Sequence, residues 1–384
     1  MASRKNPHKD REVQIRLEVE RFESRLESAR KRKNRFRRLS GHRLSQFEVV
    51  LPAPQVNRGP RWINLRLPKV LDLITNFEET ADFVHEMCSI ALGEGRPVRL
   101  LFDEAKQIKP TALLLLLAEL HRCRLVKGAS RVTGTYPEDE RLERMMDATG
   151  FFGLLGVVSR VEKRTQVRNV EYIKFISEDK LDEHVPKTLR QSLLGEDISM
   201  NIIARKKLFR ALSEAMINVG QHAYPAETRR RQRIQGRWWL NGTINKPRNE
   251  LMIAFCDLGI GISRTLPKLY TWERIRGALA LLPGINPNDG EMIQAAMTLG
   301  RSQTGEINRG KGLNDLRSFI DQSGTGELHI FSRHGAYRYS ARGSEKVQNY
   351  RRPINGTLIK WTVPIDQVTN WIREGKPDEY EQDY

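Results

Sequence analysis

Two apolar segments separated by a few polar residues constrain the fold more than any other feature of the sequence. The run PVRLLFD, residues 97–103, is short enough for a buried strand, and TALLLLLAELHRCRL, residues 111–125, is long and apolar enough for a buried helix. A second strand, SRVTGTYP, and a second helix, EDERLERMMDATGFFGLLG, follow. Strands that alternate with helices predict a parallel sheet, so we expect an α/β fold here.

Length and composition divide the chain into four parts. Its 384 residues are enough for two domains, each with its own core. We expect a charged helical arm and linker over 1–60, a small α/β domain over 61–178, a second α/β (α+β) domain over 179–366, and an acidic tail over 367–384. The linker is indicated by LPAPQVNRGPR, and the polar tail GKPDEYEQDY is typical of disorder.

The first domain resembles the small STAS-type domains of bacterial regulators, because Asp103 ends a strand just before a helix. In signalling members of that family, a Ser or Thr at the start of the helix accepts a phosphate, and Thr111 is the matching position. The family's Asp-Ser-Ser/Thr-Gly pattern is replaced here by IKPTALL. The alternative is that these residues only begin the helix, with Pro110 in its first turn.

The segment SEAMINVGQHAY, residues 213–224, places Glu214, Asn218 and His222 at intervals of four residues. Each interval advances about 40° around a helix, so the three polar side chains are expected along one edge. Apolar residues recur on the adjoining face, as a helix packed on a sheet requires; they are Leu208, Ala211, Leu212, Ala215 and Val219. The alternative is a partly solvated helix with three unrelated polar residues.

The second domain also contains strand patterns. GRWWLNGTIN and NELMIAFCDLG predict a hairpin whose second strand ends at Asp257. GELHIFSRHGAYRYS and NGTLIKWTVPI predict two further strands. The intervening residues show only patches of helical pattern, so we expect a long connection there.

Three further segments favour a ligand site in this half of the chain. DLGIGI, residues 257–262, follows a predicted strand, and its glycines let backbone approach a ligand closely. NRGKGLNDL, residues 308–316, puts glycines and a lysine before a predicted helix, where free N–H groups bind phosphate. Gly356 and Thr357 begin the last predicted strand.

With these four segments in order, residues 179–366 resemble a GHKL-type ATPase domain, the Bergerat fold shared by DNA gyrase B, Hsp90, histidine kinases and MutL. The helix with Glu214, Asn218 and His222 resembles most closely that of the anti-sigma-factor kinases. The resemblance implies an α/β sandwich with a mixed sheet, bound ATP and Mg²⁺, and an ATP lid at about 263–309.

The resemblance also implies roles for single residues. Glu214 is the expected general base, Asn218 the expected Mg²⁺ ligand, and Asp257 the expected partner of the adenine amino group, assisted by Thr357. The other implied nucleotide contacts are His222, Gly259, Gly261, Arg301, Ser302, Gly310, Lys311, Gly312 and Gly356. A helix cap is the alternative for His222, and a polar turn is the alternative for Arg301, Ser302 and Thr304.

The chain is strongly basic, with a formal net charge of +18. Arg30–Arg38 packs seven basic residues into nine, and Arg229–Arg233 four into five. Such charge favours a polyanionic partner such as nucleic acid, although these runs are more often solvated arms.

Cysteine usage and hydropathy bear on the compartment. Cys88, Cys123 and Cys256 are far apart and lack metal-ligand spacing, so we expect reduced, buried thiols. No apolar run reaches the roughly 18 residues that span a bilayer, so we expect a soluble cytoplasmic protein with no membrane partner.

Three functions remain open from the sequence. The first is an ATPase that acts as a conformational switch in a bacterial regulatory or defence system, with a protein partner or homodimer contact through the N-terminal region. The second is a Ser/Thr protein kinase of the anti-sigma-factor type. The third is a nucleotide-gated nucleic-acid-binding protein that uses Arg30–Arg38.

Overall fold

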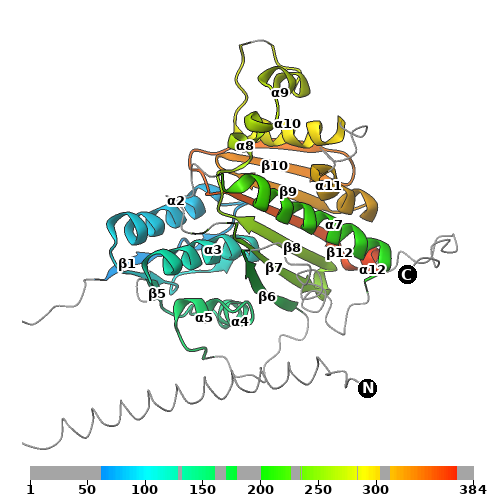
Figure 1. The fold of residues 1–384 in the computed structure, drawn as a ribbon. Coiled ribbons are helices and arrows are strands. Elements are labelled where there is room, and N and C mark those ends of the chain that lie inside the picture. Colours follow the sequence, from blue (N-terminus) through cyan, green and yellow to red (C-terminus); the bar gives the residue numbers. More distant parts are fainter. Residues whose placement is uncertain are drawn as a thin grey trace, which may run out of the picture. The chain divides into compact units, whose positions relative to one another are not determined.

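The computed structural model describes residues 62–128, 132–160, 170–179, 200–225, 234, 236–282, 284–302 and 312–369. The predicted arm with Arg30–Arg38, the basic run Arg229–Arg233 and residues 370–384 of the predicted tail lie outside these ranges. The described residues combine helices with strands, as expected for an α/β protein (Figure 1). They belong to one compact unit, which begins at Gly59.

The first part of this unit contains the predicted parallel sheet. Its strands are β1 (Ile63–Arg66), β3 (Val98–Leu101) and β5 (Val132–Gly134), in the order β1-β3-β5. Both pairs are parallel, which confirms the prediction. β2 (Val70–Leu71), which follows β1, and β4 (Gln107–Ile108), which follows β3, form a separate short parallel pair.

The helices of the first part are α2 (Phe77–Cys88), the π-helical η1 (Ser89–Glu94), α3 (Pro110–Lys127), α4 (Glu140–Ala148) and α5 (Phe151–Leu155). The single helix expected from EDERLERMMDATGFFGLLG is therefore two helices. Gly150, with φ of 82°, separates them, because a helix does not continue through a left-handed residue.

A seven-stranded sheet dominates the second part, in the order β11-β10-β9-β12-β8-β7-β6. Its strands are β6 (Val170–Glu178), β7 (Trp238–Asn245), β8 (Glu250–Asp257), β9 (Glu327–Ser332), β10 (Gly335–Ser340), β11 (Glu345–Asn349) and β12 (Thr357–Pro364). Every neighbouring pair is antiparallel, so the expectation of a mixed sheet is wrong. The reason is that β12 lies between β8 and β9, which would otherwise be parallel neighbours.

The strands of the large sheet differ from the sequence prediction in three respects. GELHIFSRHGAYRYS forms both β9 and β10, and the chain reverses at Arg333, whose φ is 55°. The polar strand β11 was not predicted. β6 precedes the predicted boundary at residue 178, yet it pairs with β7 in the larger sheet. The hairpin of β7 and β8, with β8 ending at Asp257, is confirmed.

Both faces of the large sheet are buried at β7, β8 and β9, which explains why these strands are almost continuously apolar. Along β8, Leu251, Ile253 and Phe255 face one core, while Met252, Ala254 and Cys256 face another. This alternation follows from the two-residue period of a strand.

Different helices cover the two faces. On one face lie α7 (Ile202–Asn218), α10 (Asp289–Ser302) and α11 (Gly312–Ser323), and on the other α3 contacts β7 and β8 (Figure 1). Six leucines of α3, at positions 113–117 and 120, are buried although they lie on every side of the helix, because this part of α3 lies between the small and large sheets. The remaining helices are the π-helical η3 (Val219–Ala223), the 3₁₀-helical η5 (Lys246–Arg248), α8 (Ile262–Leu269), α9 (Trp272–Ala278) and α12 (Ile365–Thr369). The first residues of the predicted tail thus belong to α12.

Candidate functional site

Helix α7 carries the first two residues of the predicted site. Its start is capped by Asn201, whose side chain accepts a hydrogen bond from the Ala204 N–H at 2.9 Å. Its apolar face packs into the core as predicted. Glu214 and Asn218 lie half-buried one turn apart, and the Asn218 Nδ2 donates to Glu214 Oε1 at 2.8 Å. The four-residue spacing therefore brings these two side chains into direct contact.

The third residue of the predicted edge, His222, lies outside α7. The α-helix ends at Asn218, and the chain widens into the π-helical η3, which contains His222. A π turn changes the angular spacing of side chains, and the role of His222 as a nucleotide contact stays a prediction. It is half-buried, and burial lowers its pKa.

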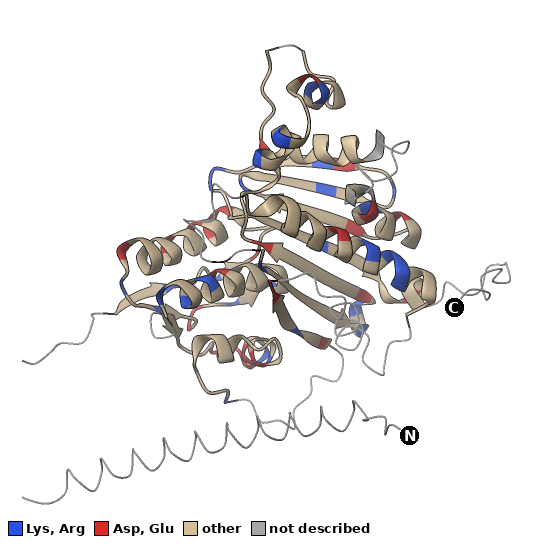
Figure 2. Cartoon of the chain, in the orientation of Figure 1, with Lys and Arg blue, Asp and Glu red and all other residues tan. Residues whose placement is uncertain are grey.

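The electrostatic surroundings of Glu214 favour proton binding. Burial raises its pKa, the hydrogen bond from Asn218 opposes the rise, and the negative charge of Asp315 on α11 adds to it. The basic residues of α7, Arg205, Lys206, Lys207 and Arg210, all lie in the half of the helix before Glu214 (Figure 2). The helical segment from Ala211 to Ala223 contains no lysine or arginine.

Asp257 is a buried carboxylate at the end of β8. The Gly259 N–H donates to its Oδ1 at 2.7 Å. Burial raises the pKa of Asp257 to about 7, against the opposing effect of backbone hydrogen bonds from Gly259 and Thr357. Thr357 lies directly opposite Asp257 in the register of β12 and β8.

The turn after Asp257 is fastened to the end of the α7–η3 helix. The Ile260 N–H donates to the carbonyl of Ala223 at 2.9 Å, and the Leu258 N–H donates to the Tyr224 hydroxyl at 3.0 Å. That hydroxyl donates in turn to the Arg237 carbonyl at 2.8 Å. These hydrogen bonds hold the turn after Asp257 against the end of the helical segment that carries Glu214 and Asn218, although the two segments are far apart in sequence.

The site glycines are required by contacts within the protein. A Cβ on Gly259 would overlap the carbonyl of Ala223, and one on Gly356 would overlap the carbonyl of Asp257. Gly261 and Gly356 also have positive φ angles of 82° and 71°. Contacts within the protein therefore require these glycines, and their predicted contacts with a nucleotide stay a prediction.

Ser332 is a site residue that the sequence analysis missed. It is fully buried at the end of β9. Its Oγ accepts from the Ile262 N–H at 2.9 Å, donates to the Gly356 carbonyl at 3.1 Å, and lies 3.1 Å from the Thr357 Oγ1. The available signal was a lone serine that ends an apolar strand. Ser332 joins the start of α8 to the start of β12.

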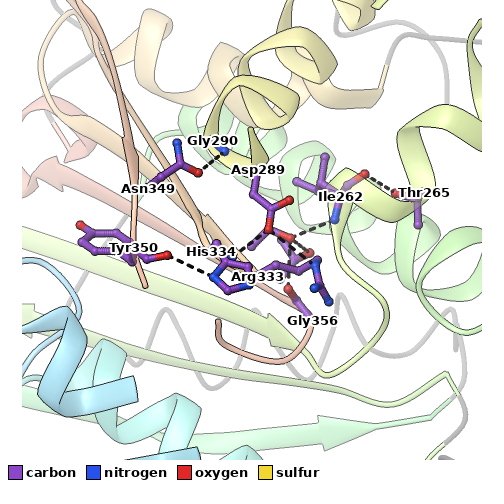
Figure 3. Close-up of polar contacts among 11 residues, drawn as sticks. Ile262, Thr265, Asp289, Gly290, Arg333, His334, Asn349, Tyr350 and Gly356 are labelled. Atoms are coloured by element: carbon purple, nitrogen blue, oxygen red, sulfur yellow. Dashed lines mark hydrogen bonds and ion pairs between the residues drawn. The ribbon is translucent and has the colours of Figure 1, made fainter. Parts of the chain in front are cut away.

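Part of the predicted lid is firmly anchored. Asp289, at the start of α10, accepts from the His334 N–H at 3.0 Å and lies 3.6 Å from the Arg333 Nε (Figure 3). The next residue, Gly290, donates its N–H to the Asn349 Oδ1 at 3.1 Å. α10 also packs on β10 and β11. Helix α10 within 263–309 is therefore a fixed layer over the sheet.

Several predicted phosphate contacts cannot be placed. Gly310, Lys311 and Thr304 lie outside the described residues. Arg301 and Ser302 are the last two residues of α10, and Gly312 is the first of α11. α10 thus ends directly before the segment 303–311, and α11 begins directly after it. The phosphate contacts of Arg301, Ser302 and Gly312 stay a prediction.

The described residues contain no group of three or more His, Cys, Asp or Glu side chains arranged to hold a metal ion. All three cysteines are buried and free, as predicted. None of the described helices is both long and apolar enough to cross a membrane.

Comparison with models of known protein families finds no match for this sequence, and comparison with curated protein sequences finds none either.

Proposed function

We propose that this chain binds Mg²⁺-ATP between the α7–η3 helix, the turn after Asp257 and the start of β12, and that it hydrolyses the nucleotide. The observation that carries the proposal is the Asn218–Glu214 hydrogen bond on a helix whose end is tied to the turn after a buried carboxylate. These are the groups that a GHKL-type ATPase requires, in the same chain order.

Asp257 suits recognition of adenine. A buried carboxylate is costly unless donors satisfy its oxygens. The exocyclic amine of adenine is such a donor, and it adds to the hydrogen bond that Asp257 already accepts from Gly259. Guanine presents a carbonyl oxygen at the equivalent place and would face the carboxylate without a proton between them, so the same group supports discrimination against GTP.

Asn218 suits a Mg²⁺ ligand. Since a carboxylate only accepts hydrogen bonds, the Asn218 Nδ2 faces Glu214 and its Oδ1 is left to face a cation. Mg²⁺ is commonly held by one or two protein oxygens together with substrate phosphates and water, so a cluster of three acidic ligands is not needed. When bound, Mg²⁺-ATP would supply the phosphoryl group, and its metal ion would supply positive charge that offsets the charge of the phosphates.

Glu214 suits the general base. Its raised pKa, caused mainly by burial, makes it a better proton acceptor than an exposed glutamate. The hydrogen bond to Asn218 holds its carboxylate one helical turn from the proposed metal ligand. In that place it would accept the proton of a water molecule that attacks the γ-phosphate, while the bond from the γ-phosphorus to the β-phosphate oxygen breaks and ADP leaves.

Burial of Thr111 favours hydrolysis over phosphorylation of the chain's own STAS-like part. Thr111 lies in the first turn of α3 and is only 5% exposed. The neighbouring Pro110 carbonyl accepts a hydrogen bond from Asn241 of β7 at 3.1 Å, which holds this turn against the large sheet. A kinase acting on Thr111 would need this turn to move away from the large sheet. We therefore favour a conformational ATPase, acting in a bacterial regulatory or defence setting.

Incubation with ATP labelled at the γ-phosphate tests the proposal. We expect Mg²⁺-dependent release of labelled phosphate, no labelled protein, and loss of release in Glu214→Gln with binding of ATP retained. Gln221→Ala is the matched control, because Gln221 is exposed in η3 just beyond the proposed ligand and should leave the rate unchanged. Label on the protein would favour a kinase, and absence of ATP binding would refute the proposal.

A further inference from the structure

The loop that leads into β12, residues 350–356, is held by helices of the first part of the chain. Asn355 precedes Gly356 and Thr357, the two residues that lie against Asp257. Its Nδ2 donates to the Oε1 of Glu119, on α3, at 2.6 Å. A side chain from the STAS-like part thus reaches the turn of the proposed nucleotide site.

Glu119 is unusual because it is fully buried and negatively charged in the middle of an apolar helix. Its Oε2 accepts from the Arg122 Nε at 2.5 Å and from the Cys88 thiol at 3.5 Å. Its Oε1 accepts from Asn355. Removing a carboxylate from water has a desolvation cost that hydrogen bonds and an ion pair offset only in part. A role other than packing would explain why a glutamate occupies this position.

Helix α2 grips the same loop at its other end. The Glu78 carboxylate accepts from the Arg351 N–H at 2.6 Å and from the Arg352 N–H at 3.2 Å. The ring of Phe77 stacks on Tyr350 with centroids 3.8 Å apart. The Arg351 and Arg352 side chains both pair with Asp82. The loop is therefore fixed to α2 at one end and to α3 at the other.

We propose that Glu119 is a positioning residue of the ATP site, which acts through Asn355 on the Gly356–Thr357 turn and couples nucleotide binding to the packing of α2 and α3. The proposal rests on the function proposed above. Because binding free energies are reciprocal, a partner that shifts α3 alters the affinity for ATP, and ATP alters the packing of α3 to the same extent. The STAS-like part is then the place where a signal enters or leaves.

The test is ATP affinity of the full chain, measured by calorimetry with Mg²⁺, for Asn355→Ala, Glu119→Ala and the double variant. Asn355 is exposed apart from its contact with Glu119, so Asn355→Ala is expected to fold. We expect each single variant to weaken ATP binding on the order of tenfold, because both remove the Asn355–Glu119 hydrogen bond. The double variant should bind ATP no more weakly than the single variant with the lower affinity.

Glu143→Ala is the matched control. Glu143 is also a nearly buried glutamate on a helix of the first part, and it is paired with an arginine, Arg160, at 2.7 Å, but it does not contact the 350–356 loop. It should lower the free energy of unfolding and leave ATP affinity within about twofold of wild type.

Hydrogen exchange gives a readout that a purely structural role would not move. In the wild-type chain, ATP should increase the protection of α3 amides, and in Asn355→Ala it should not. Unchanged ATP affinity in a folded Asn355→Ala variant overturns this inference alone. A wild-type chain that does not bind ATP removes the proposed function and this inference with it.

Discussion

The carbonyl oxygen of Ala223 accepts a hydrogen bond from the Ile260 N–H at 2.9 Å. This bond joins the end of the helix that carries Glu214 and Asn218 to the turn that follows Asp257. The same Ala223 carbonyl lies so close to Gly259 that there is no space for a side chain there. The geometry of the proposed site therefore depends on a contact between two backbones.

Gly259→Ala should disrupt this contact. The added methyl group would overlap the Ala223 carbonyl, so the free energy of unfolding should fall by about 1–3 kcal/mol or more. Gly277→Ala in α9 is the control, because nothing lies within 4 Å of the added Cβ. It should be neutral or stabilising by up to about 1 kcal/mol. Chemical denaturation measures both, and equal stability of the two variants would contradict the contact.

Asp257 should make stability depend on pH. Its pKa is about 7 in the folded chain, above the ordinary value of roughly 3.9 in an unfolded chain. Between these values the folded state binds the extra proton, so stability falls as pH rises, by up to about 1.4 kcal/mol per pH unit. Asp257→Asn keeps an acceptor for Gly259 but does not titrate. Its stability relative to wild type should therefore rise from pH 4 to 7 and then level off, which urea denaturation at each pH would show.

ATP affinity should have the opposite pH dependence. The adenine amine donates best to the ionised carboxylate, so binding should strengthen as pH rises through about 7. Calorimetry between pH 6 and pH 8 measures this. His222→Ala is the control for a second titrating group nearby and should keep the same profile. Binding that weakens over this range would argue against contact between Asp257 and the base.

Asn218→Ala should lose the part of ATP affinity that depends on Mg²⁺. Binding in excess chelator should be nearly unchanged, because the variant keeps Asp257 and its turn, whereas binding with Mg²⁺ should fall on the order of tenfold. Ser213→Ala, a half-buried neighbour on the same helix, is the control. An equal loss with and without Mg²⁺ would assign Asn218 a structural role instead.

Local sequence patterns predicted much of this architecture. The strand at 98–101, helix α3 and the β7–β8 hairpin lie where their apolar patterns predicted them. The length and spacing of an apolar run indicate whether it is buried as a strand or as a helix. The contact between Glu214 and Asn218 also follows from helical spacing. Such features depend on residues close together in sequence.

Features that depend on distant residues were not predicted. The place of β12 between β8 and β9 makes the large sheet antiparallel, and no pattern within a strand records which neighbour it will have. The change to a π turn after Asn218 was not predicted either, because the spacing of His222 alone suits an α-helix. Ser332 and Glu119 acquire their significance from partners 25 and 236 residues away, Thr357 and Asn355.

One core includes residues from both parts of the chain: Phe102, Leu113 and Met146 from the first, and Trp239, Cys256 and Phe331 from the large sheet. A protein cut between these parts would expose that whole apolar face of the sheet to water. The carboxy-terminal half expressed alone should therefore aggregate, so tests of the proposed nucleotide chemistry must use both halves on one polypeptide.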